Sequence, residues 1–117
     1  MTARHAIARF VEVYNQGGSE VFPLYGETLE WIEMPSGRRG GRDELFLALR
    51  QVREVFSDCR IQALSLVAEG DDGVLESELQ LTSAKDGSVL RCRALWFFGF
   101  TDGKIVRQHD YSFVLAI

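Results

Sequence analysis

The stretch ALWFFGFTDGKIVRQHDY, residues 94–111, carries the strongest fold signal in this sequence. Its centre, Thr101-Asp102-Gly103-Lys104, is an Asp-Gly turn of the kind that joins two antiparallel strands. Residues 94–98 are apolar on both faces of a strand, so we expect a covering layer on each side. We predict strands at residues 88–100 and 105–117, both well above the usual length of about 5–6 residues. Strands this long twist, wrap around packed helices and leave a concave cavity.

The same pattern of strands and glycine-containing turns continues toward the N-terminus, where helices precede it. Two more strands are predicted at residues 60–69 and 74–83, the second ending at an Asp-Gly turn. A first helix can be capped by Thr2 and ends at Gly17-Gly18. Four elements are predicted between them: a short helix capped by Ser19 and running to about Tyr25, a strand at Leu29–Met34, a loop at Pro35–Gly41 and a helix at Arg42–Phe56. This order predicts an α+β domain.

Composition narrows the function classes. The chain has 117 residues, 46% hydrophobic and 26% charged, as expected for one domain spanning residues 1–117. A net charge of −4 and an isoelectric point of about 5.1 argue against a nucleic-acid partner. The sequence lacks an apolar run of the ~20 residues that a membrane helix needs, so we expect no membrane partner. Residues 1–8 lack an apolar signal core, and we expect a cytoplasmic protein.

The two cysteines, Cys59 and Cys92, show no CxxC spacing. We interpret them as reduced, mostly buried thiols, with a disulfide between them as the alternative. The two histidines, His5 and His109, have no carboxylates at ligand spacing, so no metal site is expected.

Short motifs occur in a fixed order along nearly the whole chain. They are FVEVYN at residues 10–15, LEW at 29–31, GRDEL at 41–45, AEGD at 68–71, and FGFTDGKIVR at 98–107 followed by Asp110-Tyr111. Their order and spacing resemble the nuclear transport factor 2-like superfamily, and most of all its SnoaL-like and ketosteroid-isomerase-like branch. The resemblance implies a cone-shaped (cystatin-like) α+β barrel, in which a curved antiparallel sheet wraps around N-terminal helices. It also implies an apolar pocket and a homodimer through the open sheet face.

No cofactor and no single reaction follow from this resemblance, because the fold hosts isomerases, cyclases, hydrolases, dehydratases and non-catalytic binders. A ketosteroid isomerase needs a tyrosine, a carboxylate base and a protonated aspartate in its pocket. Ungapped matching, with one gap at the Asp102 turn, places Phe10, Met34 and Trp96 at those positions. Strand parity turns Glu33 away from the face of Met34. We therefore expect a pocket that lacks the isomerase triad.

The resemblance also assigns the faces of the last two strands. Residues expected to face the cavity are Cys92, Ala94, Trp96, Phe98, Val106, Gln108, Asp110 and Ser112. Residues expected to face away are Arg91, Arg93, Leu95, Phe97, Arg107, His109, Tyr111 and Phe113. The hydrophobic pattern of the last strand alone favours the opposite phase, because the outward set, with Ile105 and Leu115, is the more apolar. A subunit interface on the outer face accounts for this conflict.

Asp110 is the candidate catalytic residue. The alternative is a structural carboxylate that is hydrogen-bonded to Gln108, Tyr14 or the backbone, or paired with an arginine. A carboxyl group in an apolar cone has its charged form disfavoured, which raises its pKa toward a useful range. In SnoaL-like cyclases a polar group near Trp96 pairs with an acid near Asp110, and here only the acid remains. The resemblance also places Asp110 where limonene-epoxide-hydrolase-like proteins carry a water-activating aspartate. That chemistry needs a second acid and an arginine, which Glu76, Glu78 and Arg93 supply only if they turn inward.

The candidate ligand-binding residues form an aromatic cup with one amide: Phe10, Tyr14, Trp31, Met34, Trp96, Phe98 and Gln108. Plain core packing is the alternative for each of them, and Asp110 is a possible partner for the Tyr14 hydroxyl. The basic loop with Arg38, Arg39 and Arg42 either guides an anionic ligand or is solvated. The leading hypothesis is a domain that binds a small, largely apolar molecule, with acid/base chemistry by Asp110. The alternatives are a non-catalytic ligand-binding or protein-interaction module, and a structural dimer whose cavity is plugged by side chains.

Overall fold

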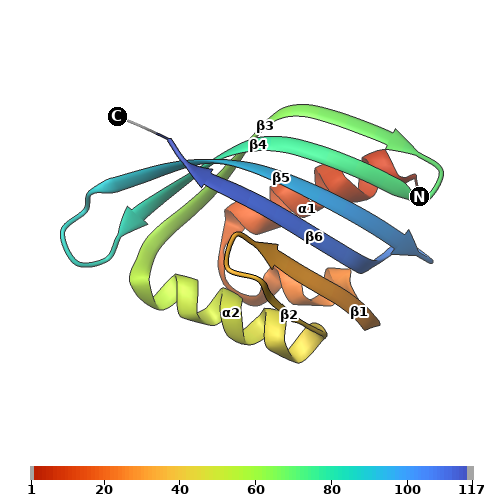
Figure 1. The fold of residues 1–117 in the computed structure, drawn as a ribbon, viewed down its shortest axis with the longest axis horizontal. Coiled ribbons are helices and arrows are strands. Elements are labelled where there is room, and N and C mark those ends of the chain that lie inside the picture. Colours follow the sequence, from red (N-terminus) through yellow and green to blue (C-terminus); the bar gives the residue numbers. More distant parts are fainter. Residues whose placement is uncertain (1, 116–117) are drawn as a thin grey trace.

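The computed structural model describes residues 2–115 and shows helices packed against one curved sheet (Figure 1). The helices are α1 at Ala3–Gln16, the 3-10 helix η1 at Gly18–Leu24 and α2 at Arg42–Val55. The strands are β1 at Tyr25–Met34, β2 at Arg38–Gly40, β3 at Phe56–Glu69, β4 at Asp72–Ser83, β5 at Val89–Thr101 and β6 at Lys104–Val114. The predicted α+β class is therefore confirmed. Residues 116–117 of the last predicted strand lie outside the described residues.

The sheet has the strand order β2-β1-β6-β5-β4-β3, and its two edges do not pair with each other, so it curves without closing. Strands β3, β4, β5 and β6 pair antiparallel with one another in chain order, as predicted. The pairing of β1 with β6 is parallel, so the sheet is mixed rather than wholly antiparallel. This pairing brings residues about 80 positions apart in sequence into neighbouring register, with Trp31 beside Gln108 and Glu33 beside Asp110.

The helices lie on the same side of the sheet in Figure 1, and they supply the covering layer that the apolar strands need. Helix α1 packs across β3, β4 and β5, while α2 packs against β1 and β3. The buried face of α1 includes Ile7, Phe10 and Tyr14, at the spacing that the sequence predicts. The side-chain amide of Asn15 donates to the Ile61 carbonyl and accepts from the Ile61 N–H, which ties the end of α1 to β3.

Several predicted boundaries were wrong. Strand β1 begins four residues earlier than expected, directly after η1, and η1 has no side-chain cap from Ser19. The predicted loop at residues 35–41 contains the short strand β2, which folds back antiparallel on β1. Helix α2 passes into β3 without a loop, because Phe56 already has extended backbone angles.

The predicted Asp-Gly turn at residues 101–104 is confirmed. Asp102 and Gly103 have φ angles of 51° and 76°, as a tight hairpin turn between twisted strands requires. The predicted faces of β5 are also confirmed, since Ala94, Trp96 and Phe98 are buried. On β6, Gln108 and Asp110 point inward as expected.

The predicted face was wrong at one end of β6. Ile105 is buried in the core, whereas Val106 is only half-buried. The cause is a bulge: Phe100 pairs with Ile105, but the preceding Gly99 pairs with Arg107. The extra residue on β6 shifts the alternation by one position and so exchanges the two faces.

The two thiols are free and buried. Cys59 on β3 pairs in register with Leu81, and Cys92 on β5 pairs with Leu79, so β4 lies between them. Two strands separated by a third are roughly 9–10 Å apart, beyond the reach of a disulfide. The disulfide alternative was therefore wrong.

Candidate functional site

A cavity of about 170 Å³ lies between the inner face of the sheet and the helices. Apolar side chains from α2, β4 and β5 form most of its wall, and the polar groups come from α1, β1 and β6. Its lining residues are Tyr14, Trp31, Glu33, Leu45, Ala48, Leu49, Val52, Leu79, Leu81, Cys92, Ala94, Trp96, Gln108, Asp110 and Ser112. A larger hollow of about 380 Å³ opens between η1 and α2 and shares Tyr14 and Leu49 with this cavity, but Asp110 does not line it.

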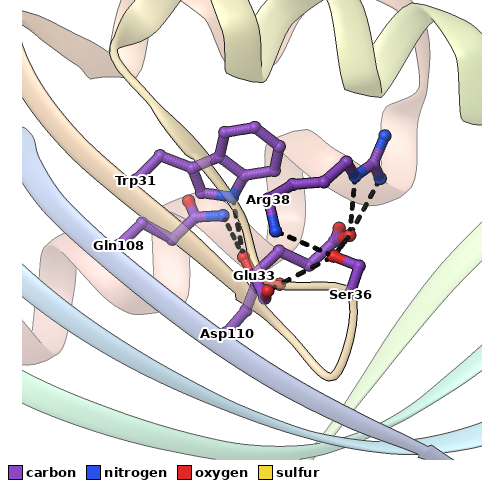
Figure 2. Close-up of polar contacts among 6 residues, drawn as sticks. All are labelled: Trp31, Glu33, Ser36, Arg38, Gln108 and Asp110. Carbon is purple, nitrogen blue, oxygen red and sulfur yellow. Dashed lines mark hydrogen bonds and ion pairs between the residues drawn. The ribbon is translucent and has the colours of Figure 1, made fainter.

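Asp110 is held in place by two donors, as Figure 2 shows. Its Oδ2 atom accepts a hydrogen bond from the Trp31 indole Nε1 at 3.2 Å and another from the Gln108 amide Nε2 at 3.0 Å. Trp31 comes from β1, and Gln108 lies two residues before Asp110 on β6, so all three side chains share the inner face. No donor among residues 2–115 forms a hydrogen bond with the other carboxyl oxygen, Oδ1.

The surroundings raise the pKa of Asp110 to about 6. Burial is the largest cause, because it disfavours the charged carboxylate, and the charge of Glu33 acts in the same direction. The hydrogen bonds from Gln108 and Trp31 and the charge of Arg38 act in the opposite direction. The pKa of Asp110 therefore lies well above that of a solvated aspartate, as the sequence argument expected of an acid in an apolar cone.

Sequence analysis placed Met34 in the cup and turned Glu33 away, and this parity was wrong. Trp31 and Glu33 share the inner face of β1, whereas the Met34 side chain is 38% exposed and does not line the cavity. The alternation of Leu29, Trp31 and Glu33 was the signal that predicts this phase, since an inward Trp31 excludes an inward Met34. Ungapped matching to the isomerase pattern obscured that signal.

Glu33 is part of a small ionic cluster at the edge of the cavity, visible in Figure 2. Its Oε1 atom accepts from the Arg38 guanidinium at 2.8 Å and from the Ser36 hydroxyl at 2.7 Å. The Arg38 guanidinium also lies over the Trp31 ring, 5.7 Å from its centre. The basic loop thus contributes one arginine to the site, because the β1–β2 hairpin folds Arg38 back onto β1.

The other predicted cup residues divide between wall and core. Tyr14, Trp96 and Gln108 line the cavity together with Trp31. Phe10 and Phe98 are fully buried and pack on each other with ring centres 5.1 Å apart, behind the wall. Phe10 and Phe98 are therefore core residues, which is the alternative interpretation that the sequence left open for each aromatic residue.

Tyr14 is not the partner of Asp110. The Arg53 guanidinium lies over the Tyr14 ring at 5.1 Å and donates to the Tyr14 carbonyl. Burial raises the pKa of Tyr14 above its usual value, so its hydroxyl stays protonated at neutral pH. A tyrosine hydroxyl in a cavity wall is a donor available to a ligand.

Tyr25, which sequence analysis did not single out, supports Gln108 instead. It lies at the start of β1, and its hydroxyl donates to Gln108 Oε1 at 2.6 Å. Both side chains are almost fully buried, at 3% and 2% exposure. Sequence analysis missed this residue because the predicted strand began at Leu29.

The second acid that chemistry of the limonene-epoxide-hydrolase type would need does not reach the cavity. Glu76 and Glu78 face outward, where they pair with Arg93 and Arg91 across β4 and β5. His109 also faces outward and contacts Glu30 at 2.9 Å. Within the described part of the chain, no group of three or more His, Cys, Asp or Glu side chains is arranged to hold a metal ion. No helix in residues 2–115 is long and apolar enough to cross a membrane.

A family model for the SnoaL-like domain matches residues 7–108, a range that begins within α1 and ends at Gln108 on β6, two residues before Asp110. The chain belongs to the SnoaL-like domain family. No curated protein sequence matches it significantly.

Solved structures with the same fold are distant in sequence from this SnoaL-like chain. IdmH, a proposed polyketide cyclase from Streptomyces antibioticus, has a TM-score of 0.85 and 17% identity, and the match covers 96% of this chain and 92% of IdmH. An NTF2-like protein from Burkholderia thailandensis has a TM-score of 0.80 and 18% identity, with 97% and 92% covered. TerC, co-crystallised with polyporic acid, has a TM-score of 0.77 and 16% identity, with 92% and 88% covered. These matches establish the shared NTF2-like fold.

Proposed function

We propose that this SnoaL-like protein binds a small, largely apolar molecule in the Asp110 cavity and that Asp110 exchanges a proton with it. The observation that carries the proposal is the arrangement of Asp110, with Oδ2 held by two donors and the rest of the wall mostly apolar. A group that titrates near 6 is present in both forms around neutral pH, and general acid/base catalysis is most efficient under that condition.

The cavity volume limits the ligand. A protein cavity of about 150 Å³ with apolar walls holds one benzene molecule. The 170 Å³ available here therefore accommodates one substituted ring unless side chains move. Asp110 and Ser112 face such a ring, and Tyr14 offers a hydroxyl from the opposite element. A ketone, enol or phenol satisfies these groups, because each can hydrogen-bond while presenting an apolar ring to the wall.

The reaction class that these groups support is an isomerisation, cyclisation or hydration by proton transfer. IdmH is a proposed polyketide cyclase and TerC was crystallised with polyporic acid, which favours ring-forming or ring-binding chemistry for this fold. No described Lys, Arg or His side chain forms an ion pair with Asp110, so its proton stays available to a ligand. The second candidate function is ligand binding without catalysis, which the absence of the isomerase triad favours.

A homodimer through the outer sheet face is part of this proposal. Phe97 and Phe113 are 37% and 62% exposed on that face, and Tyr111 packs edge-on against Phe97. Exposed aromatic groups on one sheet face are typical of protein interfaces.

The test uses small cyclic ketones in D₂O and follows exchange of the protons next to the carbonyl by proton NMR. We expect binding to the wild-type protein, exchange above the buffer rate, and loss of exchange but not of binding in Asp110→Asn. A cavity-filling variant, Ala94→Leu, should lose both. Binding without exchange supports the non-catalytic module, and binding that Ala94→Leu leaves unchanged contradicts the proposed site.

A further inference from the structure

Behind Asp110 lies a buried chain of hydrogen bonds that the proposed proton transfer does not itself use. The Tyr25 hydroxyl donates to Gln108 Oε1 at 2.6 Å, and Gln108 Nε2 donates to Asp110 Oδ2 at 3.0 Å. Trp31 Nε1 donates to the same oxygen. Because an indole N–H only donates, Trp31 can approach only an acceptor atom of Asp110.

The direction of the Gln108 amide is decided by Tyr25. Burial and the charge of Asp110 raise the pKa of Tyr25, so its hydroxyl carries a proton that must find an acceptor. Gln108 Oε1 is the acceptor that it contacts. If the amide were reversed, the buried Tyr25 proton would lose this partner, at a cost of about 1–3 kcal/mol. The amide therefore keeps its nitrogen toward Asp110.

We propose that Tyr25 is a positioning residue for Asp110: through Gln108 it fixes Oδ2 as a permanent acceptor and leaves Oδ1 as the atom that gives and takes the proton. The inference rests on the proposed role of Asp110. Both hydrogen bonds to Oδ2 persist in either protonation state, since the carbonyl oxygen of a protonated carboxyl group still accepts. Proton transfer at Oδ1 then needs no rearrangement of the buried groups behind it, which is the preorganisation that favours catalysis.

Other titratable or charged groups that face Asp110 come from several elements. They are Tyr14 on α1, Glu33 on β1, Arg38 on β2 and Cys92 on β5. The lining residues of α2 and β4 are apolar. None of the four groups bonds to Tyr25 or Gln108, so a change at Tyr25 leaves their direct influence on Asp110 in place.

The test is a pH titration of the Asp110 carboxyl carbon by ¹³C NMR in the protein without ligand. In Tyr25→Phe the amide is free to turn its oxygen toward a protonated Asp110, which stabilises the protonated form. We expect the pKa of Asp110 to rise by about one unit, the equivalent of one hydrogen bond. In a Gln108→Leu background the same substitution should produce no further rise, because no amide remains to turn. Tyr111→Phe, the same change beside Asp110 on the outer face, is the matched control.

The proposal is overturned if Tyr25→Phe leaves the Asp110 pKa within about 0.3 unit of wild type, or if the shift is equal in the Gln108→Leu background. The second result would indicate a general structural effect. If Tyr25→Phe does not fold, the test is an NMR titration of the Gln108 side-chain Nε2 protons in the wild-type protein. They should titrate together with Asp110 and exchange slowly, and their failure to titrate overturns the proposal. All these readouts are independent of turnover, so they separate this inference from the proposed function.

Discussion

Replacing Asp110 by Asn should stabilise the protein at neutral pH while removing its proposed chemistry. An asparagine side-chain oxygen can accept the hydrogen bonds of Trp31 and Gln108, so the support around position 110 is kept. The substitution removes only the cost of holding a charged carboxylate in the cavity wall. Such a gain is expected where a functional site holds a destabilising group, because removing that group raises stability at the cost of function.

The magnitude follows from the pKa of Asp110, which rises from 3.8 to about 6 on folding. Between these values the folded protein binds more protons than the unfolded chain, so its stability falls as the pH rises. At about 1.4 kcal/mol per unit, the loss is complete above pH ~7 and amounts to about 3 kcal/mol. The variant has no such loss.

The assay is urea unfolding of both proteins at several values between pH 4 and 8. The free energy of unfolding should be similar at the acid end, and the variant should lead by up to about 3 kcal/mol at pH 8. Asp71→Asn, which removes a carboxylate from an exposed turn, controls for the change in net charge. A difference between Asp110→Asn and wild type that does not change with pH would refute the reasoning.

Three further outcomes are expected. Glu33→Gln should lower the pKa of Asp110, because it removes a nearby negative charge and frees Arg38 from its ion pair. A ¹³C NMR titration measures this pKa, and a rise or no change would contradict the proposed site. Asn15→Ala should cost about 2 kcal/mol in urea unfolding, since two hydrogen bonds between α1 and β3 are lost, and an unchanged midpoint would contradict this. Phe113→Asp should convert the proposed homodimer to a monomer in sedimentation experiments, and a wild-type monomer at micromolar concentration would remove the proposal.

Local sequence was enough to predict the helices and the hairpins that join the last four strands, but not the β1–β2 hairpin. The apolar spacing of residues 3–14 defines the buried face of α1, because a helix repeats every 3.6 residues whatever it packs against. The Asp102-Gly103 pair defines the β5–β6 turn, since both residues tolerate positive φ. The position of Asp110 in an apolar cavity also followed from the family pattern and the strand period.

Long-range pairing decided the details of the site. The parallel pairing of β1 with β6 joins residues 79 and 83 positions apart, namely Trp31 with Asp110 and Tyr25 with Gln108. No local pattern encodes a contact across that distance. The bulge opposite Gly99 is also tertiary, because it depends on how β5 and β6 align, and it reversed the predicted faces of Ile105 and Val106.

The sequence alone therefore determined the class of fold, its family and its candidate acid, because these depend on short-range periodicity, turn conformation and residue order. Only the tertiary structure decided that Glu33 faces the cavity instead of Met34, that Arg38 returns to pair with it, and that Tyr25 stands behind Gln108. Each of those outcomes requires two distant segments to meet in one register, and a shift of a single residue would turn every side chain of a strand to its other face.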